Sequence, residues 1–111
     1  MKDIQNKTCI RFHWRERNSP SWVYIRRGRG FGCWSYVGRQ GGGQLLNLQA
    51  PNCLYKGTVI HELMHAIGFF HEQSRPDRDA YVTVNWPNIR NRERYNFAKY
   101  DLNYVNTQGL R

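Results

Sequence analysis

Short apolar stretches, one of them alternating strictly with polar residues, predict β-strands in the first half of the chain. The stretches are residues 8–14, 22–25, 33–39 and 44–50. Successive side chains of a strand point to opposite faces, so alternation places the apolar residues of residues 8–14 on one face. Trp14, Trp22 and Trp34 fall in or beside these stretches, and we expect them to contribute to the core.

The pattern changes after Pro51, where the spacing of apolar residues becomes helical. The apolar positions are Val59, Leu63, Ala66, Ile67 and Phe70. Thr58 is the expected N-cap of this helix, and Gly68 is its expected end. Residues 88–104 are expected to be helical in part. With 111 residues the chain is at most one domain, and its predicted class is α+β, with a strand-rich half before one prominent helix.

The charge of the chain is high and unevenly distributed. The net charge is +9, and residues 1–50 carry nine basic but only two acidic side chains. Such a charge could attract nucleic acid, heparin-like polymers or an acidic substrate. On charge alone, a solvated basic surface is the favoured interpretation. No apolar run approaches about 18 residues, so we expect no membrane span, and the polar start does not resemble a secretory signal peptide.

Three cysteines, Cys9, Cys33 and Cys53, leave one thiol unpaired within the chain. A bond between Cys33 and Cys53 would close a loop worth roughly 3 kcal/mol in the chain-entropy model. Disulfides would indicate an oxidising compartment. Three reduced, buried thiols are an alternative that the cysteines alone do not exclude.

Two histidines and a glutamate form a candidate metal site on the predicted helix. His61 and His65 are four residues apart, so they lie on one face and can reach the same tetrahedral ion. Glu62 is rotated by about 100° from His61. It therefore suits a general base that takes a proton from a metal-activated water. This H-E-x-x-H pattern is typical of zinc peptidases, although three fixed positions recur by chance in roughly one chain of this length in a hundred.

Gly68 and His71 extend the pattern to H-E-x-x-H-x-x-G-x-x-H and make a chance match much rarer. A glycine is needed where the helix stops and the chain turns sharply to bring a third histidine back to the ion. Three nitrogen ligands leave a coordination position open, which is a catalytic arrangement. The pattern therefore predicts peptide-bond hydrolysis without a covalent intermediate. His13 is expected to be a surface or packing residue.

The stretch from His61 to Asp79 resembles the astacin family of secreted zinc endopeptidases, within the metzincins. The family signature H-E-x-x-H-x-x-G-F-x-H-E-x-x-R-x-D-R-D is complete here. Residues 7–12, 32–39 and 48–62 are also similar to astacin segments in their usual order. The resemblance implies one Zn²⁺ per chain, with His61, His65 and His71 as ligands and Glu62 as the general base.

The resemblance also implies a disulfide, a substrate strand and an extracellular location. Cys33 and Cys53 would form the short disulfide of the family. An extended protein or peptide substrate would add as an antiparallel strand to the edge strand over residues 33–39. The residues expected to contact it are Cys33, Trp34, Ser35 and Tyr36. No nucleic-acid partner is expected.

The same resemblance implies that residues 1–111 are a partial peptidase domain. The expected fold is a twisted, mostly β upper lobe followed by an active-site helix, as in zincins and metzincins. The only methionines are Met1 and Met64, so the Met-turn and the lower lobe of the family are expected to be missing. Two other interpretations stay open: a truncated, inactive remnant that binds zinc, and a basic module that binds polyanions.

Overall fold

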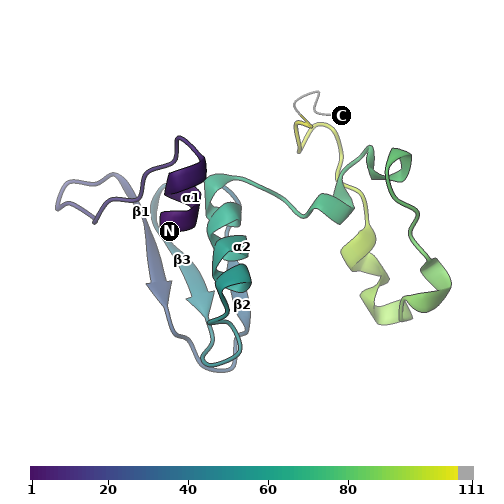
Figure 1. Ribbon diagram of the computed structural model, residues 1–111, viewed down its shortest axis with the longest axis horizontal. Coiled ribbons are helices and arrows are strands. Elements are labelled where there is room, and N and C mark those ends of the chain that lie inside the picture. The colour runs from purple at the N-terminus through teal and green to yellow at the C-terminus, as the bar shows by residue number, and fades with distance from the viewer. Residues whose placement is uncertain (108–111) are drawn as a thin grey trace. The chain divides into compact units, whose positions relative to one another are not determined.

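The computed structural model describes residues 1–107, and the chain divides into two compact units, residues 1–69 and 70–111. The elements of the first unit are α1 (Lys2–Lys7), β1 (Ser21–Arg26), β2 (Cys33–Ser35), β3 (Gly42–Leu48) and α2 (Lys56–Ile67). Those of the second unit are the 3₁₀ helices η1 (Glu72–Ser74), η2 (Arg78–Ala80), η3 (Trp86–Asn88) and η4 (Asn91–Phe97). The first unit has the α+β class predicted from the sequence (Figure 1).

The sheet of the first unit is small and mixed, with the strand order β1-β3-β2. β1 runs parallel to β3, and β2 pairs antiparallel with β3. β2 has a strand on one side only, so it is an edge strand, in agreement with the edge strand expected over residues 33–39. A parallel pair needs a crossover connection, and here the chain passes through β2 between β1 and β3.

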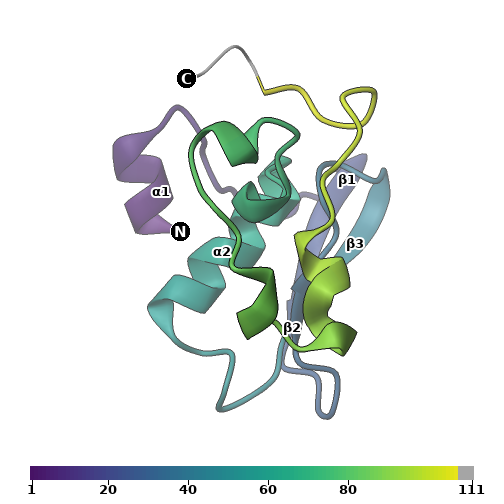
Figure 2. The ribbon, with the colours of Figure 1, turned by 90° about the vertical axis from the view of Figure 1, so that its right-hand side faces the viewer.

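One face of the sheet and α2 enclose a small apolar core. Leu46 and Leu48 of β3 alternate with Asn47 along the strand, so both leucines point to the same face. They pack with Leu63 of α2 and with Ile4 of α1. The short helix α1 lies beside α2, and Lys56 Nζ is 3.0 Å from a carboxylate oxygen of Asp3 (Figure 2).

The buried contacts of the second unit are polar. Within residues 70–107 the only buried side chains are those of Ser74 and Arg78. The guanidinium of Arg78 donates hydrogen bonds to the carbonyls of Gln73 and Phe97 and to the carboxylate of Asp79. One buried arginine thus joins three points of this unit.

Three sequence predictions about the first unit are wrong in detail. Residues 8–14 form no strand; their apolar side chains Ile10 and Phe12 pack on the core from an irregular segment. Trp14, expected in the core, is 96 % exposed. The helix begins at Lys56 after Tyr55, so Thr58 lies inside it and does not cap it.

The predicted third and fourth strands, and the predicted end of the helix, correspond to observed features. The third strand is shorter than residues 33–39, because the chain leaves the sheet after Ser35. The backbone N–H of Gly38, at φ 73°, donates to the carbonyl of His65 instead. Gly68 ends α2 as predicted, with φ 125°. In the second unit, the helical part predicted within residues 88–104 is the 3₁₀ helix η4.

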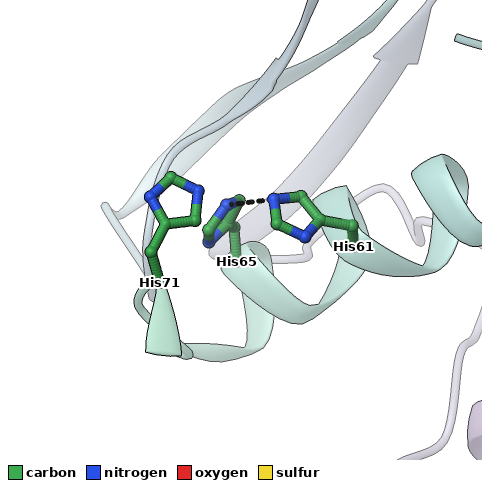
Figure 3. A group of neighbouring side chains, drawn as sticks. All are labelled: His61, His65 and His71. Carbon is green, nitrogen blue, oxygen red and sulfur yellow. Dashed lines mark hydrogen bonds between the residues drawn. The ribbon is translucent and has the colours of Figure 1, made fainter. Parts of the chain in front are cut away.

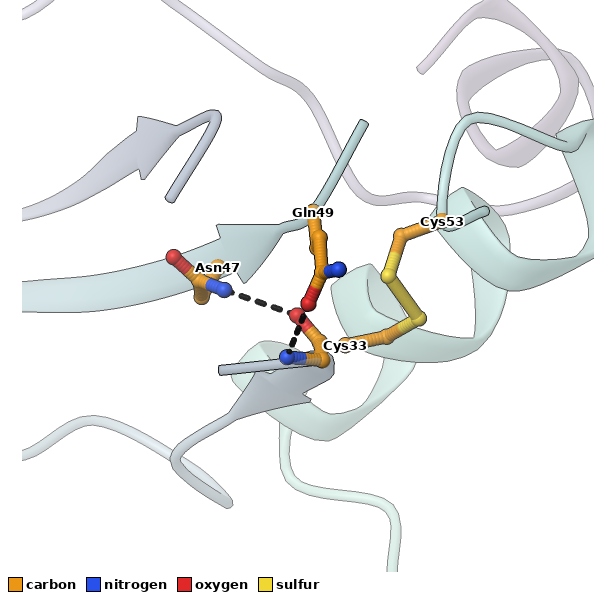
Figure 4. Close-up of a disulfide and its surroundings, with 5 residues drawn as sticks. Cys33, Asn47, Gln49 and Cys53 are labelled. Carbon is orange, nitrogen blue, oxygen red and sulfur yellow. Dashed lines mark hydrogen bonds between the residues drawn. A yellow bond between two sulfur atoms is a disulfide. The ribbon is translucent and has the colours of Figure 1, made fainter. Parts of the chain in front are cut away.

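A disulfide joins Cys33 of β2 to Cys53, just before α2 (Figure 4). Cys9 is a free, exposed thiol. The resemblance to astacins implied this pairing of Cys33 with Cys53. In the chain-entropy model, the bond stabilises the first unit by about 3 kcal/mol. Among the helices of residues 1–107, none has the length and apolar character needed to cross a membrane.

Candidate metal centre

Two histidines of α2 present ring nitrogens to the same point. His61 and His65 are one helical turn apart, and their side chains project from one face of the helix (Figure 3). The Nε2 atoms of the two rings are 3.0 Å apart, and the ring planes are nearly perpendicular. The four-residue spacing in the sequence thus produces the convergence that was predicted.

The orientation of His65 is fixed by the turn that follows the helix. Its Nδ1 is 2.7 Å from the carbonyl oxygen of Phe69, which can only accept a hydrogen bond. Nδ1 therefore carries the proton in the neutral ring, and the lone pair lies on Nε2, which faces His61. The turn depends on Gly68, whose φ of 125° is a conformation that side chains with a Cβ rarely adopt.

His71 follows three residues after Gly68 and completes the group. The possible ligand atoms of His61, His65 and His71 all lie within 4.8 Å of one another (Figure 3). Within residues 1–107, no other group of three histidine, cysteine or acidic residues has such spacing. All three predicted ligands are therefore positioned to bind one metal ion.

The donor set fits zinc. Imidazole nitrogens bind Zn²⁺ at about 2.0–2.1 Å in tetrahedral geometry, so two ligand nitrogens should be separated by about 3.3 Å. The 3.0 Å between the Nε2 atoms of His61 and His65 is within a few tenths of an ångström of that value. His65 is buried, and its second ring nitrogen is already hydrogen-bonded, as in ligating histidines generally.

Glu62 lies beside the two histidines of α2 and is only 5 % exposed. Its Oε2 is buried and has no hydrogen-bond partner among the residues described. Burial raises the pKa of this carboxyl, whereas positive charge on His61 or His65 would lower it. A buried carboxylate oxygen without a partner is uncommon in a native protein, and a reactive group beside a metal is one explanation for it.

The residues predicted to contact substrate lie on or just after the edge strand. Cys33, Trp34 and Ser35 form β2, whereas Tyr36 follows it, is half exposed and packs edge-on against Trp34. The Gly38 N–H bond to the carbonyl of His65, at 2.8 Å, ties this segment to the C-terminal end of α2. The edge of the sheet and the histidines of α2 are thus linked directly.

Sequence reasoning missed two amide side chains that fix the start of β2. The side chain of Asn47 donates to the carbonyl of Gly32 at 2.7 Å, and the N–H of Gly32 donates to Oε1 of Gln49 at 2.8 Å (Figure 4). Asn47 is fully buried. The position of Asn47 between two leucines of a predicted strand is the signal that could have revealed this role. An amide at such a position is expected to be buried, and a buried amide needs hydrogen-bond partners.

The mixed sheet and the helix with its converging histidines define a candidate metal centre, and comparison with known proteins gives the family. The family model "Astacin", which describes a family of peptidases, matches residues 1–111. The chain therefore belongs to the astacin family, as its signature suggested.

Among the relatives is zinc metalloproteinase nas-14 of Caenorhabditis elegans, 44% identical over 108 residues, which are 97% of this chain and 22% of that protein. High choriolytic enzyme 1 of Oryzias latipes is 46% identical over 107 residues, 96% of this chain and 38% of the relative. The solved structure of that enzyme, a hatching enzyme zinc-protease, matches with a TM-score of 0.80 and 43% identity. The match covers 96% of this chain and 50% of that structure, so the chain spans about half of the solved relative.

Proposed function

We propose that this chain carries the zinc-binding and proton-transfer centre of a zinc-dependent endopeptidase. The observation that supports it most is the convergence of three histidine side chains beside a buried glutamate with an unpartnered oxygen. The family and the names of its relatives support zinc as the metal. One ion per chain would be bound by His61, His65 and His71.

A zinc ion in this position supplies Lewis-acid activation of a water molecule and of the scissile carbonyl. Glu62 would accept a proton from the attacking water and then transfer it to the leaving amine nitrogen. Its burial suits this role, because a raised pKa makes a carboxylate a better proton acceptor near neutral pH. No covalent bond between enzyme and substrate is needed.

The substrate would be a protein or peptide in extended form. Cys33, Trp34 and Ser35 offer the free edge of the sheet, to which an extended chain can add by backbone hydrogen bonds. Tyr36 would then contact a substrate side chain, since its ring is half exposed next to Trp34. The tie between Gly38 and His65 would keep the bound peptide in register with the metal.

Residues 1–111 would form part of a larger peptidase domain, with the remainder supplying the other wall of the cleft. The chain spans half of the solved relative, which supports this view. The disulfide between Cys33 and Cys53 favours secretion, because disulfides persist in oxidising compartments. We expect the 111-residue chain alone to cleave peptides slowly, because a catalytic site must be held to within about half an ångström.

The test is hydrolysis of a mixed peptide library by the chain fused to the remaining half of a relative's domain. Glu62→Gln keeps the size of the side chain and removes the base, so we expect cleavage to fall by about 100-fold or more. The zinc content of the variant should be unchanged. Equal cleavage by both proteins would refute the role of Glu62, and zinc-loaded protein without cleavage would instead identify an inactive zinc-binding remnant.

A further inference from the structure

The first unit carries many arginines without acidic partners. Six lie in residues 15–39: Arg15, Arg17, Arg26, Arg27, Arg29 and Arg39. The only carboxylate of that segment is Glu16. Among residues 1–107, no ion pair includes any of the six arginines or Glu16. Positive charge thus accumulates around β1 without internal neutralisation.

Two of these arginines lie over aromatic rings, and both contacts involve residues of β1. The guanidinium of Arg15 is 3.6 Å from the ring centre of Trp22, and that of Arg26 is 5.9 Å from the ring centre of Phe31. Trp22 and Arg26 are four residues apart in β1, so they point to one face. Tyr24 lies between them on that face and is 58 % exposed.

This face is opposite the core. Ile25 of β1 is aligned with Leu46 of β3, whose side chain points toward α2, so Trp22, Tyr24 and Arg26 point away from it. Gly43 allows the arrangement, because a Cβ there would be 2.8 Å from the ring of Trp22. We call the set Arg15, Trp22, Tyr24, Arg26 and Phe31 the arginine–aromatic stripe.

The stripe holds its guanidinium groups ready for anions. A guanidinium that rests its flat face on a ring keeps its N–H donors at the edge, where they can bind two oxygens of one anion. Nε of Arg26 donates to Oδ1 of the buried Asn47 at 3.1 Å, which fixes the group and leaves both Nη atoms available. Little freedom of the Arg26 side chain remains to be lost on binding, which favours affinity.

We propose that the arginine–aromatic stripe binds a sulfated polysaccharide. Trp22, which carries Arg15, and Arg26 are separated by about 13 Å along the strand, at about 3.3 Å per residue, and this spacing suits a linear polymer with repeated anions. The disulfide of the same unit indicates an oxidising compartment, which favours an extracellular polysaccharide over nucleic acid. This surface does not depend on the proposed metal chemistry.

The experiment is a titration of the chain with heparin oligosaccharide at several salt concentrations. Arg15→Gln with Arg26→Gln should raise the Kd by about tenfold and lower the slope of log Kd against log salt by about two. The matched control is Arg90→Gln with Arg92→Gln, which removes the same charge from exposed positions of the second unit. The control should change the Kd by no more than about threefold. Equal losses in both double variants would overturn the proposal.

Two further measurements separate the stripe from bulk charge. Phe31→Ala, at a 67 % exposed ring, leaves the charge unchanged and should weaken binding about threefold by removing the support of Arg26. No effect of this variant would contradict the contribution of the contact between Arg26 and Phe31. Single-stranded DNA of equal charge should bind at least about tenfold more weakly, and tighter DNA binding would overturn the choice of ligand. Added chelator should not alter heparin binding, whatever the fate of the metal site.

Discussion

The two units of the chain are stabilised in different ways. Residues 1–69 have a small apolar core in which Leu46 and Leu63 are almost completely buried, and a disulfide beside it. Residues 70–107 bury no apolar side chain. They are joined by Arg78 and by ion pairs of Arg75 with Asp77 and of Lys99 with Asp79. Two ring pairs, Phe70 with Tyr100 and Trp86 with Phe97, add contacts between side chains that are not buried.

The difference bears on the surroundings of each candidate ligand. His61 and His65 lie on a helix packed on the core, whereas His71 lies at the start of the polar unit. Apolar burial is insensitive to pH, but charge pairs at the surface contribute little and are screened by salt. We therefore expect His61 and His65 to stay in place under conditions that loosen the segment around His71.

The largest effect is expected from the core. Leu46→Ala removes a side chain with no exposure and should lower the free energy of unfolding of the first unit by about 3 kcal/mol. Chemical denaturation monitored by circular dichroism measures it. Leu102→Ala is the control, since Leu102 is 70 % exposed, and it should cost less than about 0.5 kcal/mol. Similar losses for both variants would contradict the contrast between the units.

A smaller effect is expected from the buried arginine. Arg78→Met leaves the carbonyls of Gln73 and Phe97 without their charged donor, which should cost the second unit about 2 kcal/mol. Native-state hydrogen exchange at the amides of Tyr81 and Val82, both bonded to the carbonyl of Arg78, reports this locally. Amides in β3 should not change. Unaltered exchange at residues 81 and 82 would show that Arg78 does not anchor this unit.

Acid should loosen the second unit before the first. Hydrogen bonding to Arg75 lowers the pKa of Asp77, and hydrogen bonding to Lys99 and Arg78 lowers the pKa of Asp79. A depressed pKa contributes stability above the ordinary aspartate value of 3.8, and this stability is lost as pH falls through the folded value. In the first unit, Asp3 beside Lys56 behaves likewise, but the apolar core remains.

Residue-resolved NMR spectra would follow both units at once. The pH would be lowered from about 6 to about 2.5, a range that brackets the ordinary pKa of aspartate. Amides of residues 70–107 should lose dispersion at a higher pH than those of β3. Asp77→Asn with Asp79→Asn should remove most of this pH dependence. Simultaneous loss of both sets of signals would mean that the ion pairs do not distinguish the units.

The sequence predicted the helix, its end at Gly68 and the convergence of three histidines, because each depends on local spacing and on one permissive backbone position. It failed at residues 8–14, where the alternation of Ile10 and Phe12 arises from packing on the core without strand pairing. It also missed the role of Asn47, whose partners lie 15 and 21 residues away in the chain. Contacts of that kind are set by the fold and not by local pattern.

The most direct test of the metal centre is the zinc content of the folded chain. We expect one zinc ion per chain after dialysis against a weak chelator, and loss of nearly all of it in His65→Ala, which removes a buried nitrogen ligand. His13→Ala is the matched control, because His13 is the one histidine outside the group, and it should retain the ion. A zinc content near zero in correctly folded wild-type protein would contradict the account.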